Sequence, residues 1–414
     1  MTPCYFRTTK GMVMKAGVLY ISYDGMLEPL GQSQVLAYQK RLSKDFKIHL
    51  ISFEKEEDLR NKQQFDRLRA EIVASGIVWH PLKYHKKPSA LATLWDIAIG
   101  AFLGLWIVLR HNLAVVHARS YVPSVIALIL KRLSGVRFLF DMRGFWADER
   151  VDGGLWQANG RLYRTAKWFE RRFLLKADHV VSLTHAAVRE MEKFPYLNNA
   201  MPPITIIPTC ADLNRFVPLK KETSDSEAPF VLGYVGSAGT WYLFPEVARS
   251  FVQLLKLKPA SRFLIVNKGE HEYILGELKK AGVPESAIEL KSATHDEVPL
   301  FMSQMDASVF FIKPVFSKQA SAPTKLAEFL GCGKPCLGNS GVGDMADVLE
   351  TEQVGIALNQ FDDESLKLGM KQLVDLAADP SIQARCVAAA QKHLSLNEGV
   401  TRYSAIYKML TENK

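Results

Sequence analysis

The sequence predicts an α/β protein built from two doubly wound domains. Its 414 residues exceed what a single hydrophobic core usually serves. Apolar runs alternate with helical stretches along nearly the whole chain, which is typical of parallel sheets covered by helices. The alternation is interrupted at the polar segment 220–228 and then restarts, so we expect a linker there between two Rossmann-like domains.

The apolar runs give the expected strands in order. Those of the first domain are Val18–Ser22, Ile48–Phe53, Ile77–His80, Ala114–Ala118, Arg137–Met142, His179–Leu183 and Ile204–Pro208. Those of the second are Phe230–Val235, Arg262–Asn267, Ala287–Lys291, Ala307–Ile312, Pro335–Gly338 and Gly355–Leu358. Helices are expected between them and at the end, among them Glu56–Ser75, Gly160–Ala177, Ala378–Leu394 and Leu396–Leu410. We place the domains at 1–215 and 216–395, a returning helix at 396–414, and residues 1–14 outside the fold.

The segment 317–339 is the most informative part of the chain. It follows an apolar run that predicts a buried parallel strand, and Pro323 stands where the first turn of a helix is expected. The free N–H groups of such a turn suit a phosphate, and Lys325 lies in the same turn. Glu328 follows one turn later, where its carboxylate can accept hydrogen bonds from a ribose. The segment therefore predicts a nucleoside-diphosphate site.

This segment resembles the donor-site signature of retaining family 4 glycosyltransferases of the GT-B fold. The resemblance spans nearly the whole chain and implies two Rossmann-like domains facing a cleft, with the last helix returning to the first domain. It implies that Glu328 holds the ribose and that no metal ion or other cofactor is needed. The family's commoner variant has a second Glu eight positions earlier, where this chain has Ala320. That departure puts the identity of the transferred sugar in doubt.

Two further loops match places where this family contacts the donor. The loop 22–35 contains Gly31 and Gln32, and Ser33 is a candidate helix cap. In the segment 233–242, Ser237 stands where the family has an arginine, and no lysine follows before position 256. Positive charge must then come from elsewhere. The candidate donor-binding residues are Gly31, Gln32, Gly236, Ser237, Gly239, Thr240, Lys268, Lys313, Ser321, Thr324, Lys325 and Glu328.

The loop 140–150 combines aromatic and charged side chains at the end of a predicted strand. Aromatic faces stack on sugar rings and carboxylates bind hydroxyls, so the loop is a candidate acceptor or reaction site. The alternative is a loop whose aromatics fill the core and whose charges pair with one another. The candidate catalytic residues are Asp141, Arg143, Lys325 and Glu328. The candidate acceptor-binding residues are His117, Arg119, Trp146, Asp148 and Glu149.

Composition and charge indicate the cellular compartment and the kind of partner. Five scattered cysteines do not form a disulfide framework or a zinc site, and no signal peptide precedes the fold, so we expect a cytoplasmic protein. The first 220 residues carry 32 Lys and Arg against 19 Asp and Glu, whereas the remainder carries 20 against 24. Without nucleic-acid motifs, this basic half suits an anionic membrane surface or a pyrophosphate-bearing acceptor.

One apolar segment, 91–109, is about as long as a membrane span and has basic residues on both sides. It contains Asp96 and is followed at once by a predicted strand, as a helix of an α/β unit would be. We expect a helix that is buried or lies at a membrane interface, with a true span as the alternative.

The predicted function is transfer of a sugar, with retention of configuration, from a nucleoside-diphosphate sugar to a glycan or lipid-linked acceptor. The resemblance suggests the assembly of capsule, O-antigen or exopolysaccharide. A non-catalytic sugar-nucleotide sensor or partner subunit is the first alternative, because the family's Glu and Arg/Lys pair are missing. An NAD-dependent oxidoreductase is less favoured, since the Gly-x-Gly-x-x-Gly fingerprint is absent.

Overall fold

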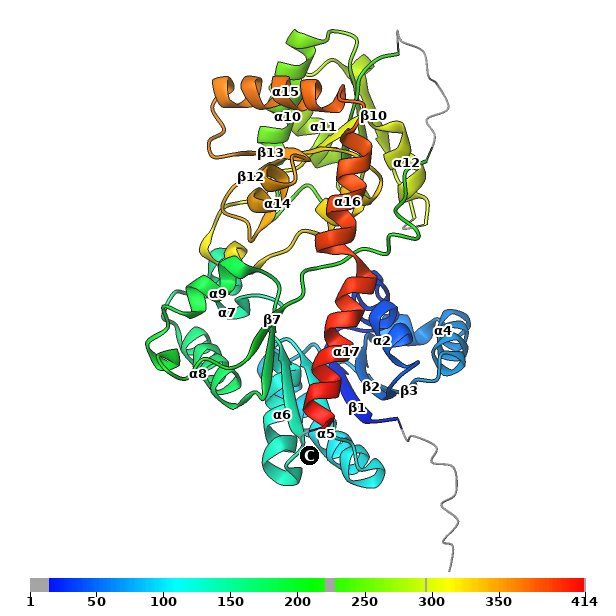
Figure 1. Cartoon of the computed structure of the whole chain (residues 1–414), viewed down its shortest axis with the longest axis vertical. Helices are drawn as coiled ribbons and strands as arrows, with labels where there is room; N and C mark the ends of the chain where they lie inside the picture. The colour runs from blue at the N-terminus through cyan, green and yellow to red at the C-terminus, as the bar shows by residue number, and fades with distance from the viewer. Residues whose placement is uncertain (1–14, 220–227, 295, 413–414) are drawn as a thin grey trace, which may run out of the picture.

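The computed structural model describes residues 15–219, 228–294 and 296–412, which form two α/β domains stacked end to end (Figure 1). The expected linker falls largely outside the described residues. The first domain holds a seven-stranded parallel sheet in the order β3-β2-β1-β4-β5-β6-β7. Its strands are β1 Gly17–Ser22, β2 Lys47–Glu54, β3 Val78–Lys83, β4 Val115–Arg119, β5 Arg137–Asp141, β6 His179–Ser182 and β7 Ile204–Ile206.

The second domain holds a six-stranded sheet in the order β10-β9-β8-β11-β12-β13, again with all pairs parallel. Its strands are β8 Val231–Val235, β9 Arg262–Val266, β10 Ile288–Lys291, β11 Ala307–Val309, β12 Cys336–Asn339 and β13 Gly355–Leu358. Each of the thirteen predicted strands is present, and most ends differ by one or two residues. The predicted two-domain fold is confirmed.

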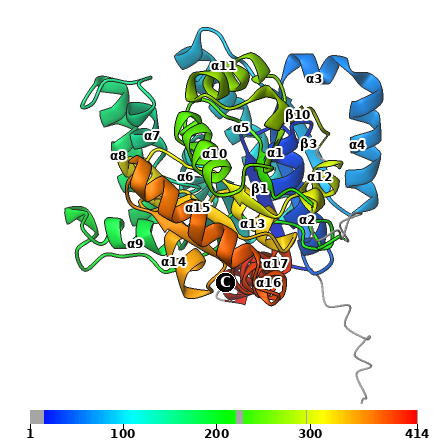
Figure 2. The ribbon, with the colours of Figure 1, turned by 90° about the horizontal axis from the view of Figure 1, so that it is seen from above.

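Helices flank the sheets of both domains (Figure 1 and Figure 2). Those of the first domain are α1 Pro29–Gly31, η1 Gln32–Leu36, α2 Ala37–Leu42, α3 Glu56–Arg60, α4 Lys62–Ala74, α5 Ser89–His111, α6 Tyr121–Ser134, α7 Trp146–Asp152, α8 Arg161–Lys176, α9 His185–Met191 and η2 Pro195–Leu197. Those that follow are α10 Phe244–Leu257, α11 His271–Ala281, η3 Glu285–Ala287, α12 Val298–Gln304, η4 Phe316–Ala320, α13 Thr324–Gly331, α14 Met345–Thr351, α15 Asp363–Ala377, α16 Ile382–Leu394 and α17 Leu396–Glu412.

Two local predictions were wrong. The single helix expected over 56–75 is broken at Asn61, whose side chain accepts a hydrogen bond from the N–H of Gln64 and so starts α4 anew. Ser33 caps no helix, because it lies inside the π-helical turn η1, where its hydroxyl donates to the carbonyl of Pro29. Side chain–backbone bonds of this kind are short-range alternatives that periodicity does not reveal.

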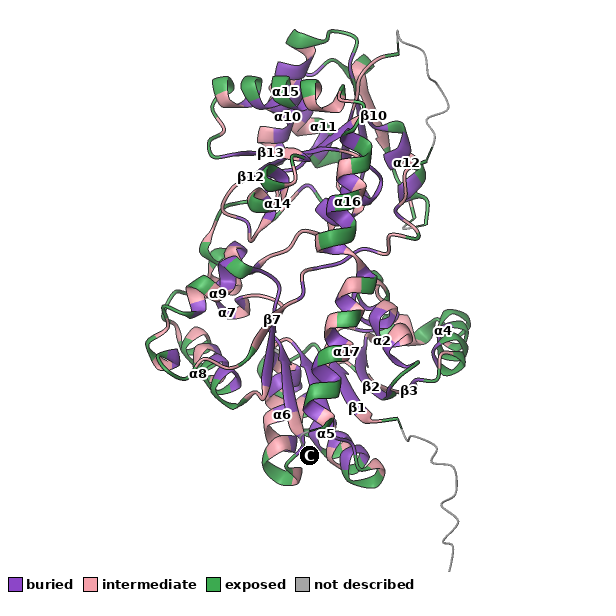
Figure 3. Ribbon diagram, in the orientation of Figure 1, coloured by how far each residue is buried: buried purple, intermediate pink, exposed green. Residues whose placement is uncertain are grey.

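Buried residues lie along both sheets and on the inner faces of the helices (Figure 3). In the first domain α5, α6 and α8 supply the core on one face of the sheet, and α2, α4 and α17 supply it on the other. Helix α16 belongs to the core of the second domain, whereas α17 crosses to the first domain. The expected return of the last helix is confirmed.

Candidate active site

Helix α13 places the predicted lysine and glutamate at the carboxyl end of β11. Pro323 is the N-cap residue in an extended conformation, so the helix begins at Thr324 and its first N–H groups lie at the open end of α13. Lys325 is buried and Glu328 is half-buried. The two residues are three positions apart, so they share one face of the helix.

Lys325 sits in an aromatic cage. Its ammonium lies 3.5 Å from the ring centroid of Tyr242 and 4.4 Å from that of Tyr234, and it donates a 3.2 Å hydrogen bond to the carbonyl of Ser237. Burial lowers the pKa of Lys325 to about 7, although Glu328 and Glu270 oppose that shift. The cage holds a cation that is poorly solvated and ready for an anionic partner.

The pKa of Glu328 is shifted in the opposite direction to that of Lys325. Burial raises the pKa of its carboxyl to about 7, against the opposing effect of Lys325 and Arg215. Arg215 comes from the segment that leaves the first domain, and it forms a 3.0 Å ion pair with Asp296. Glu328 is thus next to charged groups from two parts of the chain, as a residue at a domain junction would be.

The loop between β8 and α10 lies against Lys325. Gly236 has a φ of +96°, and a Cβ added there would come within 2.9 Å of the Lys325 side chain. The positive φ favours glycine at this position, and a larger residue would also displace the end of the Lys325 side chain. The N–H groups of Ala238 and Gly239 donate to the two carboxylate oxygens of Glu270, each at 2.9 Å.

Asn267 fixes that arrangement. Its side-chain amide donates to the carbonyl of Gly236 at 3.0 Å and to Glu270 at 2.9 Å, and its oxygen accepts from the backbone N–H of Glu270. Burial opposes ionisation of Glu270, but the bonds from Ala238 and Asn267 outweigh it and lower the pKa of the carboxyl. A carboxylate of this chain is thus bound at the loop where the family contacts the donor diphosphate.

The segment η4 joins the two domains. Ala320 is buried in the core cluster of the first domain, although it belongs to the second. Lys318 forms a 2.8 Å ion pair with Glu149 of α7 and lies 3.7 Å from the ring centroid of Trp241. The position at which the family places a sugar-contacting glutamate is therefore used here for packing between domains.

A second connection lies at α9. The carboxylate of Asp344 accepts hydrogen bonds from the backbone N–H groups of His185 and Ala186, at 2.7 and 2.9 Å. It also lies 3.0 Å from Nδ1 of His185. Since an acidic group is favourable at a helix N-terminus, this contact caps a helix of one domain with a residue of the other.

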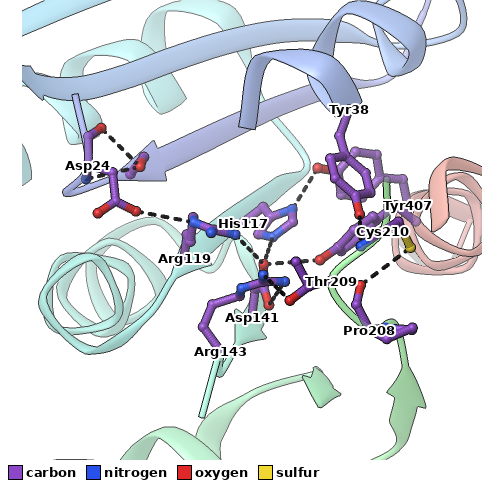
Figure 4. A network of polar contacts seen from close by, with 12 residues as sticks. Asp24, Tyr38, His117, Arg119, Asp141, Arg143, Pro208, Thr209, Cys210 and Tyr407 are labelled. Atoms are coloured by element: carbon purple, nitrogen blue, oxygen red, sulfur yellow. Dashed lines mark hydrogen bonds and ion pairs between the residues drawn. The ribbon is translucent and has the colours of Figure 1, made fainter. Parts of the chain in front are cut away.

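The charged residues predicted in the first domain form a buried network beside α17 (Figure 4). Asp141 accepts a 3.0 Å bond from the hydroxyl of Tyr403, and Nδ1 of His117 lies 2.7 Å from the hydroxyl of Tyr407. Burial opposes ionisation of Asp141, but Arg143 and His117 outweigh it and lower its pKa, while burial lowers the pKa of His117. Both side chains are about 1% exposed, so this arrangement favours a role in positioning over contact with substrate.

Two arginines complete the network. Arg119 is buried, with its Nε 3.3 Å from Asp24, and a terminal nitrogen of Arg143 donates to Thr209 at 3.4 Å. Arg143 has a φ of +57°, a conformation that non-glycine residues seldom adopt. Arg119 and Arg143 both approach the carboxylate of Asp141, at 3.7 and 4.0 Å, so the structure brings these three candidates together at the carboxyl ends of β4 and β5.

The aromatic loop mainly supports structure. Trp146 packs against Tyr121 and Trp156, and Asp148 accepts bonds from Tyr163 and Lys167. Together with the pairing of Glu149 across the domains, this is the alternative that the sequence left open for this loop. Contact of Trp146, Asp148 and Glu149 with an acceptor stays a prediction.

The other predicted donor residues are distributed over the facing loops. A Cβ on Gly31 would come within 2.0 Å of the carbonyl of Gly25, so the turn there is tight. Gln32, Lys268 and Lys313 are exposed, whereas Ser321 and Thr324 are half-buried beside the start of α13. Thr240 has a φ of +56°. Four residues around Lys325 were not predicted from the sequence: Tyr234, Tyr242, Asn267 and Glu270. The one signal for Asn267 and the nearby Glu270 is that Asn267 ends a predicted strand.

A cavity of about 340 Å³ lies between the two domains, next to the start of α13. It is lined by Pro323 and Leu326, by α9 and α14, and by the junction of α16 with α17. Lys325 and Glu328 do not line it. The cavity therefore belongs to the domain junction rather than to the predicted donor site.

Residues 41–208 match the family model described as a glycosyl transferase 4-like domain. The match covers most of the first domain, 168 of the 414 residues of the chain. The resemblance to family 4 glycosyltransferases is thereby confirmed, and the match supports glycosyl transfer as the activity. No curated protein matches the sequence.

Solved structures share the GT-B fold over the whole chain. A glycosyltransferase from Rickettsia africae is 16% identical with a TM-score of 0.69, and the match covers 97% of this chain and 100% of that one. Sucrose-phosphate synthase from Thermosynechococcus elongatus is 12% identical with a TM-score of 0.71, over 97% and 100%. Anabaena HepE, solved with UDP and glucose, is 13% identical with a TM-score of 0.66, over 94% and 99%.

Proposed function

We propose that this glycosyl transferase 4-like protein moves a sugar from a nucleoside-diphosphate sugar to a glycan or lipid-linked acceptor. The observation that carries the proposal is the placement of Lys325 and Glu328 one turn apart on α13, with Lys325 hydrogen-bonded to the loop 236–240. The lysine would stabilise the negative charge that develops on the leaving diphosphate, and the glutamate would bind the ribose. HepE, which shares this fold, binds UDP and UDP-glucose, which supports a donor of this class.

We further propose that the configuration of the sugar is retained and that no metal ion or other cofactor takes part. Retention rests on the resemblance to the retaining enzymes of family 4. The resemblance also suggests a place in capsule, O-antigen or exopolysaccharide assembly. Ala320 replaces the family's sugar-contacting glutamate and is buried in the core of the first domain, so other residues would contact the transferred sugar.

A panel of nucleotide sugars tests the proposal. Thermal unfolding with UDP-, GDP-, ADP- and dTDP-sugars should show stabilisation by one nucleotide series, since a ligand that binds only the folded state raises its stability. The stabilising donor is then incubated with lipid-linked and oligosaccharide acceptors, and NMR of the product gives its anomeric configuration. Inversion would refute retention alone, whereas stabilisation by NADH and not by any nucleotide sugar would refute the function.

A non-catalytic sugar-nucleotide sensor is the second candidate, because the loop 236–240 carries no arginine or lysine and already holds Glu270. Tight binding of a nucleotide sugar with neither transfer nor donor hydrolysis would favour it over an enzyme.

We propose that the protein works in the cytoplasm at the membrane surface. Helix α5 is long and apolar enough to span a membrane, but 39% of its most apolar stretch is buried in the fold. Its outer face presents an apolar stripe of Leu91, Leu94, Trp95, Phe102, Trp106 and Leu109. Exposed Lys83, Lys86, Lys87 and Arg110 flank the stripe, as suits a helix lying on anionic lipid.

A further inference from the structure

Glu270 is bound where an anion would be expected. Its carboxylate accepts both N–H groups of the pair Ala238–Gly239, and a third bond comes from the amide of Asn267. These N–H groups lie at the carboxyl edge of β8, on the loop that also supplies the Ser237 carbonyl to Lys325. Adjacent backbone N–H groups at such an edge are a common cradle for phosphate oxygens.

We infer that Glu270 occupies the phosphate cradle of the donor site in the free protein and must be displaced when a nucleoside diphosphate binds. This inference rests on the proposed function. It accounts for the two N–H groups of Ala238 and Gly239 in a loop without the family's arginine, since Glu270 satisfies both of them. The ammonium of Lys325 feels the charge of both Glu270 and Glu328, and it donates to the carbonyl of Ser237 on the same loop.

The consequence is competition within the molecule. A diphosphate and the Glu270 carboxylate cannot share the same two donors, and their like charges repel each other in a partly buried site. Glu270 therefore lowers the affinity for the diphosphate and makes the loop rearrange on binding. A residue that served only to hold the loop would have the opposite effect, since its loss would loosen the cradle and weaken binding.

Glu270→Gln tests this difference, with inorganic pyrophosphate as a probe that does not depend on the nucleotide base. The glutamine keeps the size of the side chain but loses the charge and one acceptor, so we expect pyrophosphate to bind about tenfold more tightly in calorimetry. Glu272→Gln is the matched control, because Glu272 is exposed two residues away and carries the same charge. It should change the affinity by less than about twofold.

Glu270→Asp separates contact from charge. The shorter aspartate keeps the charge but reaches the two N–H groups less well. Pyrophosphate should therefore again bind more tightly than to the parent, but less tightly than to Glu270→Gln. The aspartate variant also provides the test if Glu270→Gln does not fold. Unchanged or weaker binding in folded Glu270→Gln, or an equal gain in Glu272→Gln, would overturn the inference. In that case the proposed function would still stand if the parent protein binds a nucleotide sugar. If neither the parent nor any variant binds pyrophosphate or a nucleotide sugar, both the inference and the proposed function are contradicted.

Discussion

The ammonium of Lys325 lies 3.5 Å from the ring centroid of Tyr242, in a buried site at the start of α13. A cation held against aromatic rings keeps part of its electrostatic stabilisation while losing its hydration. Such a lysine pairs strongly with an incoming anion, because little water has to be displaced from it. This relationship gives the first two predictions.

Lys325→Ala should weaken nucleoside-diphosphate binding about ten- to a hundredfold, as the loss of a hydrogen bond to a charged group costs ~1.5–3 kcal/mol. Calorimetry with the stabilising nucleotide measures this directly. Lys371→Ala, which removes an exposed lysine of α15, is the control and should have little effect. Equal affinity of parent and Lys325→Ala would contradict the assignment.

The lowered pKa of Lys325 predicts a pH dependence of stability. The pKa is about 7 in the folded protein against 10.5 ordinarily, so the unfolded chain binds more protons between these values. The free energy of unfolding should therefore rise with pH over this window, relative to Lys325→Met. Urea unfolding of both proteins at pH 7, 8 and 9 should show a growing difference in favour of the parent. A flat difference would mean that the lysine is well solvated.

Glu328→Gln should abolish most transfer while leaving the affinity for pyrophosphate nearly unchanged. If Glu328 binds the ribose, the substitution weakens two charge-assisted bonds together, and pyrophosphate has no ribose to lose. Transfer rates and pyrophosphate calorimetry on the same preparation provide the comparison. Parallel loss of both, or full activity, would refute the ribose assignment.

Asp344→Ala should loosen the start of α9. Loss of a capping carboxylate costs about 0.5–2 kcal/mol, so amide hydrogen exchange at residues 185–187 should accelerate several-fold. Asp347→Ala is the matched control, since Asp347 is exposed on α14, the helix that begins directly after Asp344. If exchange is equally slow in both variants, Asp344 does not hold the domains at this point.

Phe102→Ser should weaken membrane binding. The Phe102 side chain is 79% exposed, and burying a phenylalanine in lipid contributes roughly 1.5–3 kcal/mol. Flotation with vesicles containing anionic lipid should show at least tenfold weaker binding, and binding of the parent should fall as salt rises. Leu368→Ser, at an exposed leucine of the second domain, should leave binding intact. No lipid binding by the parent would mean that α5 only covers the sheet.

Much of the fold was predictable because its signals are local. Buried parallel strands are apolar runs, and thirteen were located from that pattern alone. The start of α13 was visible from Pro323 and the residues after it. Where local structure depended on a side-chain bond, as at Asn61, the pattern was not sufficient.

The sequence by itself determined two parallel α/β domains and placed Lys325 and Glu328 on one helix face, because spacing along a helix fixes which residues are neighbours. Only the tertiary structure decided that His117 is buried against Tyr407, 290 positions away, and that Glu270 occupies the loop after β8. It also decided that Ala320 packs into the other domain. These contacts join segments that are far apart in the chain and come together only when the sheets and α17 pack. The periodicity of the sequence reflects local structure and does not predict such contacts.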